Sequence, residues 1–129
     1  MILGTGTDLI DIRRIERALA RFGDRFARRV LVEHEYQRFC THVKPAHYVA
    51  NRFDAKEAFS KAMGTGIRFP VNWHNVSVAN ERSGKPFLQF SEALAALLEQ
   101  RGISRAHLSL SDEVEMACAF VILEGEDRG

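Results

Sequence analysis

The chain has 129 residues, which is enough for one domain with a buried core and too few for two ordinary domains. With 46% hydrophobic and 27% charged residues and a formal net charge of +1, it is neither a disordered chain nor a uniformly basic nucleic-acid binder. We therefore expect one domain over residues 1–129. The longest apolar run, residues 117–123, is too short to cross a bilayer, so we expect no membrane contact. Because the N-terminus lacks a signal peptide, we expect the protein in the cytoplasm.

The first elements in chain order are predicted to be a strand and a helix. Residues 1–7 are apolar and interrupted by glycine, which predicts a strand that ends at Asp8. Over residues 12–22, apolar side chains recur at helical spacing. Asp11 suits the N-cap of this helix, and Gly23 suits its end, where a left-handed backbone favours glycine.

Three more helices are predicted before the middle of the chain. Short helical stretches follow at residues 26–31 and 33–41. Pro45 suits the first position of a longer helix, because the N–H group that proline lacks has no partner at that position anyway. We expect this helix to run to about residue 63 and Gly64 to cap its C-terminus.

The second half of the chain predicts strands. Residues 74–80 and 87–90 alternate between apolar and polar side chains around a Ser-Gly-Lys-Pro turn, which predicts a β-hairpin. Ser91 suits the cap of a further helix, and residues 107–111 and 117–123 have the pattern of strands. Together these elements predict a small α+β domain, with an antiparallel sheet packed against helices on one side.

Arginine is concentrated in the first helical region. Residues 13–29 contain seven arginines but only two acidic residues, Glu16 and Asp24. Several of these arginines recur every three or four residues and therefore line one side of the helix. Such a stripe is often only a solvated surface, but the local excess of positive charge also indicates an acidic partner or a phosphate.

Acidic residues in two segments are candidates for catalysis or metal binding. Asp54, Glu57 and Lys61 are spaced i, i+3 and i+7, so their side chains leave one face of the helix. Spacing alone favours a simpler interpretation, an ion pair between Glu57 and Lys61 worth about 0.2–0.5 kcal/mol. Asp8 lies in an apolar stretch, where a charge is costly unless it is paired or metal-bound. Alternatively, Asp8 caps the following helix.

Two segments resemble a known family. The sequence GTGTDLIDIRRIE at residues 4–16 is similar to the N-terminal motif of bacterial holo-[acyl-carrier-protein] synthases. The longer and more specific RFDAKEAFSKAMGTGI at residues 52–67 resembles the second motif of phosphopantetheinyl transferases at large. The Gly-Lys-Pro turn at residues 84–86 and His-Leu-Ser-Leu-Ser at residues 107–111 also match. The resemblance covers essentially the whole chain and implies a 4'-phosphopantetheinyl transferase-like fold.

The resemblance also implies an activity, the transfer of 4'-phosphopantetheine from coenzyme A to a serine of apo-acyl carrier protein, in support of fatty acid biosynthesis. Asp8 and Glu57 match the magnesium ligands of the family, and a substrate diphosphate would complete the coordination of Mg²⁺. Lys61 matches the lysine that contacts the transferred phosphate, with an ion pair to Glu57 as its resting arrangement. Either Glu57 or a magnesium-bound water would accept the serine proton, and the sequence does not decide between them.

Further matched positions are implied to bind substrates. The residues implied to bind coenzyme A are Lys61, Gly64, Gly66, Lys85, Pro86 and His107. The residues implied to bind the acidic helix of acyl carrier protein are Arg14, Arg21 and Arg25, because arginine pairs with carboxylates bidentately. Relatives assemble as homotrimers with the active site between subunits, so the resemblance implies a homotrimer here as well.

Three residues depart from the family pattern. Asp54 stands where many relatives have a small apolar residue, and it is either a partner of the metal site or, as we expect, solvated. Asp112 stands where many relatives have histidine, so an acid–base role at that position is not carried over. Ser83 replaces an asparagine found before Gly-Lys-Pro in some relatives, which removes the support for a contact there.

Two other functions stay open. One is a non-catalytic module that uses the arginine-rich helix to bind carrier protein or nucleic acid and needs no magnesium. The other is a different magnesium- and nucleotide-dependent transferase, which shares the metal face but does not use coenzyme A. The first function predicts that Glu57 is dispensable, and the second predicts that coenzyme A is not a substrate.

Overall fold

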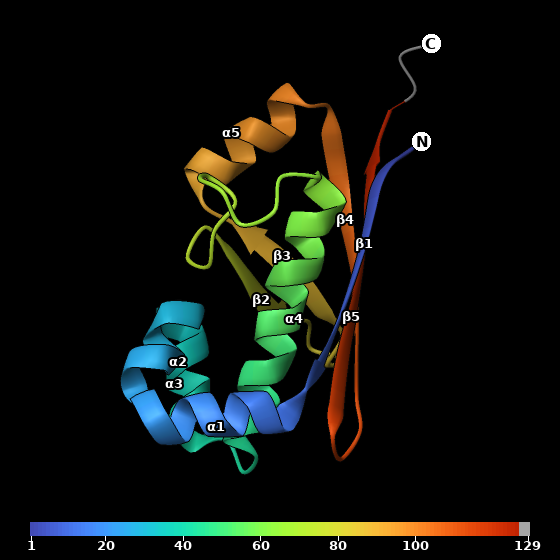
Figure 1. The fold of residues 1–129 in the computed structure, drawn as a ribbon. Helices are drawn as coiled ribbons and strands as arrows, with labels where there is room; N and C mark the ends of the chain where they lie inside the picture. Colours follow the sequence, from blue (N-terminus) through green and yellow to red (C-terminus); the bar gives the residue numbers. More distant parts are fainter. Residues whose placement is uncertain (127–129) are drawn as a thin grey trace.

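The computed structural model describes residues 1–126 (Figure 1). In chain order its elements are β1 (Ile2–Asp11), α1 (Ile12–Phe22), α2 (Asp24–Val30), α3 (Glu33–Thr41), α4 (Pro45–Met63), β2 (Val76–Asn80), β3 (Pro86–Phe90), α5 (Glu92–Gln100), β4 (Ile103–Asp112) and β5 (Met116–Gly125). Within this described part of the chain, no helix is both long and apolar enough to cross a membrane.

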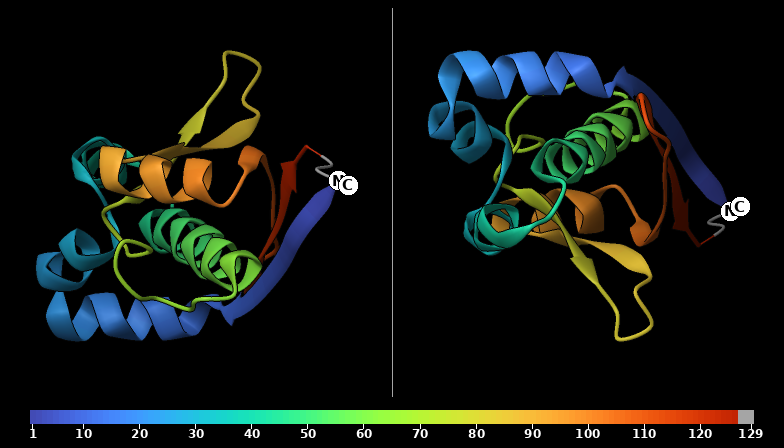
Figure 2. Two further views of the ribbon diagram at one scale, coloured as in Figure 1. Left: turned by 90° about the horizontal axis from the view of Figure 1, so that it is seen from above. Right: turned by 90° about the horizontal axis from the view of Figure 1, so that it is seen from below.

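The strands form two antiparallel sheets instead of the single sheet expected. β1, β5 and β4 lie side by side in that order, and β2 pairs with β3 as a separate hairpin. α4 packs lengthwise on the larger sheet, with α1–α3 towards one end and α5 towards the other (Figure 1). Seen along α4, the helices lie on one face of the larger sheet, and the hairpin projects from the body (Figure 2). The α+β prediction is confirmed, and one face of the larger sheet carries no helix.

α4 is the central helix of the fold, and most of its surface is buried. Ala55, Phe59 and Met63 are buried in a core that α4 shares with the larger sheet, the hairpin and α5. Val49, earlier in the helix, is buried in a second core against α1–α3. Because neighbours surround α4 on several sides, a polar side chain on it has few routes to water.

β1 lies directly against α4 because two of its residues have no side chain. A Cβ atom on Gly4 would lie 2.1 Å from the carbonyl oxygen of Ala62, and a Cβ atom on Gly6 would lie 2.0 Å from that of Ala58. Real Cβ atoms essentially never come within 3.0 Å of a heavy atom outside their own residue and its chain neighbours, so only glycine fits at these two positions. Alternate strand residues point to the same face, so Asp8 continues this row along α4.

The boundary between β1 and α1 differs from the prediction. β1 continues past Asp8 to Asp11, because Leu9–Asp11 still pair with β5. Asp11 is the N-cap of α1, as predicted, and its carboxylate accepts a hydrogen bond of 2.9 Å from the backbone N–H of Arg13. The alternative role of Asp8 as a helix cap is therefore wrong. Gly23 ends α1 with a positive φ of 56°, but its ψ of −135° lies outside the left-handed helical region that we expected.

The caps of the later helices confirm their predictions. Pro45 lies in the first turn of α4, and Gly64 ends that helix in the left-handed conformation with a φ of 75°. The hydroxyl of Ser91 accepts a hydrogen bond from the backbone N–H of Leu94 at the start of α5. β4 and β5 are both longer than predicted, since polar residues at their ends still pair across the sheet.

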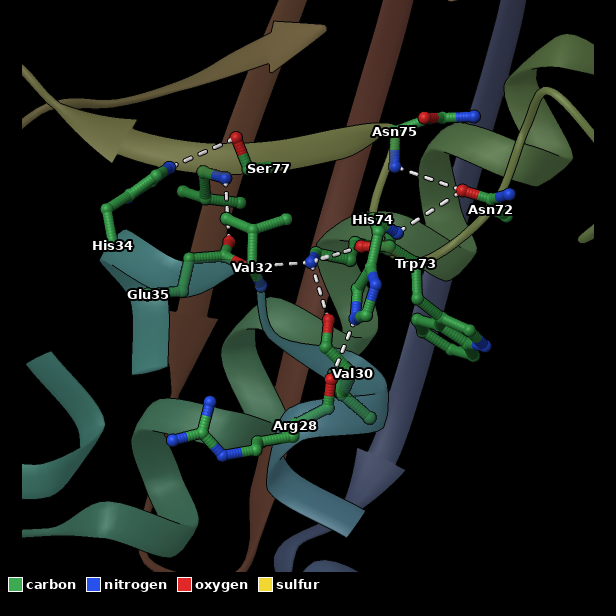
Figure 3. A network of polar contacts seen from close by, with 12 residues as sticks. Arg28, Val30, Val32, His34, Glu35, Asn72, Trp73, His74, Asn75 and Ser77 are labelled. Carbon is green, nitrogen blue, oxygen red and sulfur yellow. Dashed lines mark hydrogen bonds and ion pairs between the residues drawn. The ribbon is translucent and has the colours of Figure 1, made fainter. Parts of the chain in front are cut away.

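A buried ion pair ties α4 to the helices at its side. The ammonium group of Lys56 donates to the carboxylate of Glu35 at 2.7 Å, to the carbonyl oxygen of Val30 at 2.6 Å and to that of Trp73 at 2.7 Å. Both side chains are completely buried. The carboxylate of Glu35 also accepts from the backbone N–H of Val78 at 2.8 Å, which joins α3 to β2 (Figure 3). Lys56 lies inside the second sequence motif. Together with Glu35 it joins α2, α3, α4, β2 and the loop that contains Trp73.

Candidate active site

The side chains of Asp8 and Lys61 meet where β1 crosses α4. The ammonium group of Lys61 donates to the Asp8 carboxylate at 2.9 Å and to the carbonyl oxygen of Thr7 at 3.1 Å. The hydrogen bond to Asp8 raises the pKa of Lys61, which keeps this ammonium group charged. The predicted ion pair between Glu57 and Lys61 is therefore wrong, because a partner from β1 replaces the partner one helical turn away.

Glu57 lies in the same neighbourhood and is partly buried. Burial raises the pKa of its carboxyl group, the negative charge of Asp8 raises it further, and Lys61 acts in the opposite direction. Lys61, which binds Asp8, lies one helical turn beyond Glu57, so the charges of Asp8 and Glu57 act on each other. The carboxyl groups from β1 and from the middle of α4 thus belong to one acidic group.

Asp54 completes the acidic group, and its position corrects the prediction that it is solvated. Its side chain is completely buried, and neither of its carboxyl oxygens has a hydrogen-bond partner within residues 1–126. Burial, together with the neighbouring carboxyl group of Asp8, raises the pKa of Asp54 to about 9. The cause is β1, which covers this face of α4 and separates Asp54 from water.

This arrangement fits a hard divalent cation. Asp8 and Glu57 offer carboxylate oxygens, which are the ligands that Mg²⁺ prefers. Among residues 1–126, no three His, Cys, Asp or Glu side chains are placed so that they would directly hold one ion. Mg²⁺ commonly keeps several waters and uses only one or two protein carboxylates together with substrate phosphates, so a pair of carboxylates suits it. Within residues 1–126, the buried oxygens of Asp54 beside this pair have no hydrogen-bond partner.

Three of the residues expected to bind coenzyme A lie together in a second location. Lys85 and Pro86 of the hairpin and His107 of β4 line a cavity of about 300 Å³, beside Phe120 and Ile122 of β5. The imidazole of His107 lies 2.7 Å from the carboxylate of Glu124, which orients the ring. An apolar wall with a few polar groups at its rim suits a flat aromatic ring such as a nucleobase.

The other expected coenzyme A residues do not line that cavity. Lys61, Gly64 and Gly66 lie at the C-terminal end of α4 and just beyond it. The N–H groups of Gly64 and Gly66 donate to carbonyl oxygens of the last helical turn. Both glycines also have positive φ, of 75° and 64°, so their first role is to end α4.

The two locations lie on opposite faces of the larger sheet. Asp8 faces α4, in the same row as the two glycines of β1. His107 pairs with Ile122, and both belong to the alternate set of side chains, which points away from the helices. Asp8 is also on one edge strand and His107 on the other. One chain therefore does not present both groups to a single small ligand.

The predicted docking arginines are exposed on α1 and α2. α1 buries Ile12 and Ile15, so Arg14 and Arg21 lie on its solvent side, and Arg25 is exposed on α2. A small groove of about 280 Å³ lies beside them, and its lining residues are Ala18, Phe22, Arg25, Phe26 and Arg29. The apolar part of this groove was missed in the sequence, where the signal is the i, i+4, i+8 row of Ala18, Phe22 and Phe26 next to the arginines.

A basic cavity was also missed. Arg38, His42, Arg52 and Arg82 lie around a volume of about 430 Å³ between α3, α4 and the hairpin. Arg52 is buried and donates to the side-chain oxygen of Asn80 at 3.1 Å, and its Nε has no partner in the described part of the chain, residues 1–126. Guanidinium groups around a cavity favour phosphate or carboxylate. No sequence spacing predicts this site, because its residues come from three elements.

Comparisons with known proteins indicate the family to which the chain belongs. The model of the 4'-phosphopantetheinyl transferase superfamily matches residues 4–119. The holo-[acyl-carrier-protein] synthase of Nitrosomonas europaea is 53% identical over 124 residues, which cover 96% of this chain and 99% of that protein. Among solved structures, the holo-[acyl-carrier-protein] synthase of Neisseria meningitidis has a TM-score of 0.93 at 46% identity, with 96% of this chain and 99% of that chain covered.

A second solved structure was determined with a ligand. The holo-(acyl-carrier-protein) synthase of Bacillus anthracis, in complex with CoA (3',5'-ADP), has a TM-score of 0.82 at 38% identity, with 98% of this chain and 99% of that chain covered. The match extends over nearly the whole of both chains. The chain belongs to the 4'-phosphopantetheinyl transferase superfamily and, within it, to the holo-[acyl-carrier-protein] synthases.

Proposed function

We propose that this protein transfers 4'-phosphopantetheine from coenzyme A to a serine of apo-acyl carrier protein, in support of fatty acid biosynthesis. The products are holo-acyl carrier protein and adenosine 3',5'-bisphosphate. The observation that carries the proposal is the contact between Asp8 of β1 and Lys61 of α4, one helical turn from Glu57, in a chain that matches holo-[acyl-carrier-protein] synthases over nearly its whole length. We place this activity in the cytoplasm, a location that suits the free thiols of Cys40 and Cys118.

Mg²⁺ is the proposed cofactor, with Asp8 and Glu57 as the residues that would hold it. When bound, it would neutralise the diphosphate of coenzyme A as the bond to the nucleotide breaks. Lys61 already reaches Asp8, and its exposed ammonium group is free to turn to the transferred phosphate. Glu57, whose pKa is raised by burial and by Asp8, is well suited to receive the serine proton. A bound water is the alternative acceptor.

The cavity at the hairpin is the proposed site for the nucleotide part of coenzyme A. Its apolar wall would contact the adenine ring, and Lys85 and His107 would contact polar groups of the nucleotide. The neighbouring basic cavity shares Glu81 with it and adds three guanidinium groups for a further phosphate of the same molecule. Glu57 and Lys61 would then act at the end of the diphosphate that is farther from the nucleotide.

A homotrimer with shared active sites is proposed because of the sheet. The carboxylates and the nucleotide cavity lie on opposite faces of the larger sheet within one chain, so a neighbouring copy has to supply one of them. The face without helices also exposes Leu3, Leu9 and Phe120, which is typical of a surface that packs against a partner. A closed ring of three copies would bring each set of carboxylates to the cavity of its neighbour.

Incubation of apo-acyl carrier protein with coenzyme A and this protein tests the proposed function. Mass spectrometry is expected to show the gain of one phosphopantetheine group when Mg²⁺ is present and no gain in EDTA. A carrier protein with its acceptor serine replaced by alanine is the control. Binding of carrier protein without any mass gain would favour the non-catalytic module, and consumption of another nucleotide in place of coenzyme A would favour a different transferase.

The docking surface for carrier protein is proposed to be Arg14, Arg21 and Arg25, with the groove around Phe22 receiving an apolar side chain. The double variant Arg14→Glu/Arg21→Glu is expected to raise KM for carrier protein by about 10-fold or more, because two attractive charge pairs become repulsive. KM for coenzyme A is expected to stay constant. Arg101→Glu, an exposed arginine on the far side of the fold, is the matched control. An equal loss of affinity for both substrates would contradict this surface.

A further inference from the structure

Asp54 has a buried carboxyl group that the proposed reaction does not use. Its side chain is completely buried, and among the residues that the structure describes neither of its oxygens has a hydrogen-bond partner. Leaving a buried polar group without a partner costs about 1–3 kcal/mol, and more for a charged group. In native proteins such a group has a cause, such as a catalytic role or a water or ion that binds beside it.

The contact between β1 and α4 directs this group towards the cation site. Gly4 lies over Ala62, and Gly6 lies over Ala58, one helical turn earlier. Two strand residues span about 6.6 Å and one helical turn spans about 5.4 Å, so the two elements stay nearly in step. Continuing this row by one step brings Asp8 over Asp54, and Asp8 accordingly raises the pKa of Asp54.

We propose that Asp54 is a third carboxylate of the divalent-cation site, which orients Asp8 and binds a water of the ion without touching the ion itself. This inference rests on the proposed function, in which Asp8 and Glu57 hold the cation. The residues within 1–126 do not place three acidic side chains as direct ligands, which is why Asp54 acts through its neighbours. Groups that support metal ligands typically change metal affinity by about 10- to 100-fold.

Within residues 1–126, the buried carboxyl group of Asp54 has no hydrogen-bonded partner. Lys61, the neighbouring cation, is bound to Asp8 instead. A bound divalent ion would supply that partner through one of its waters, so part of the free energy of ion binding comes from a group that is unfavourable in its absence. Removal of Asp54 is therefore expected to stabilise the ion-free protein and to weaken ion binding.

Binding of Mn²⁺ alone, followed by electron paramagnetic resonance of the free ion, tests the inference without any assay of activity. Asp54→Asn and Asp54→Ala are expected to raise the Kd for Mn²⁺ by about 10-fold or more. Thermal unfolding gives a second measurement: both variants are expected to have a higher Tm than the unaltered protein in EDTA and a smaller rise in Tm on addition of Mg²⁺. Asp112→Asn, which removes an exposed aspartate at the end of β4, is the matched control.

Asp8→Asn separates the failure of this inference from the failure of the proposed function. If Asp8→Asn abolishes Mn²⁺ binding while both Asp54 variants bind as the unaltered protein does, Asp54 is only a structural residue and the inference is wrong. If Asp8→Asn and Glu57→Gln also leave Mn²⁺ binding unchanged, these carboxylates hold no cation, and the cation part of the proposed function falls with the inference. The isosteric Asp54→Asn keeps the packing, so a loss of affinity in this variant is not explained by an unfolded chain.

Discussion

Replacing Glu57 with glutamine is expected to lower the rate of phosphopantetheine transfer by about 100- to 1000-fold, because the variant removes a negative charge from the reacting centre but keeps the shape of the side chain. Burial and the charge of Asp8 raise the pKa of Glu57, and the change affects both the proposed cation site and the proposed proton acceptor. The measurement is the initial rate of holo-carrier protein formation. Glu113→Gln, an exposed residue between β4 and β5, is the control and is expected to react at the normal rate.

Co-expression of two impaired variants extends this prediction to the shared site. His107→Ala damages the nucleotide cavity, and Glu57→Gln damages the carboxylate group on the other face of the sheet. In a randomly mixed trimer, each site has one chance in two of an intact Glu57 and one chance in two of an intact His107, so about one quarter of the sites recover. Recovery of transfer to about this level at low coenzyme A is expected. Two variants that stay inactive when mixed, in a protein that sediments as an active monomer, would contradict the shared site.

Replacing Lys56 with methionine is expected to lower the free energy of unfolding by about 3–5 kcal/mol, because the variant leaves the buried charge of Glu35 without its counterion. It also removes the donor for the carbonyl oxygens of Val30 and Trp73. Both members of the pair are fully buried, so no water replaces the lost contacts. Urea unfolding at constant protein concentration, followed by circular dichroism, measures the effect.

A double variant and a surface variant are the controls for Lys56. Lys56→Met/Glu35→Gln is expected to lose less free energy of unfolding than the two single variants lose together, since the unpaired charge is gone. Glu33→Gln, on the same helix α3, breaks an exposed ion pair of 3.5 Å with Arg28 and is expected to change stability by less than about 1 kcal/mol. A Lys56→Met variant as stable as Glu33→Gln would show that the buried pair contributes little.

The parts of the fold that depend on neighbouring residues in sequence were predicted well. Asp11, Pro45 and Gly64 act within one turn of their own positions, so the ends of α1 and α4 are readable from local residues. The spacing of Asp54, Glu57 and Lys61 also gave the face of α4 correctly. This spacing does not show which other element of the fold covers that face.

The errors at the site have this one origin. Glu57 and Lys61 have the spacing of a local ion pair, but Lys61 binds Asp8, which is 53 residues away in the chain. Asp54 was expected to be solvated, but its side chain is buried because β1 covers this face of α4. The signal was present as a pattern in two segments, Gly-x-Gly-x-Asp in β1 and Asp-x-x-x-Ala-x-x-x-Ala in α4, which fit together only when the strand and the helix are placed in contact.

The close approach of Gly4 and Gly6 to α4 limits how the sequence can diverge. The atoms that exclude a side chain at these positions are the carbonyl oxygens of Ala62 and Ala58, which every amino acid possesses. A smaller side chain on the helix therefore makes no space for a larger residue on the strand. A second substitution on α4 cannot compensate for the loss of either glycine. Long separation between lineages should leave both glycines in place even where the surrounding core has been exchanged.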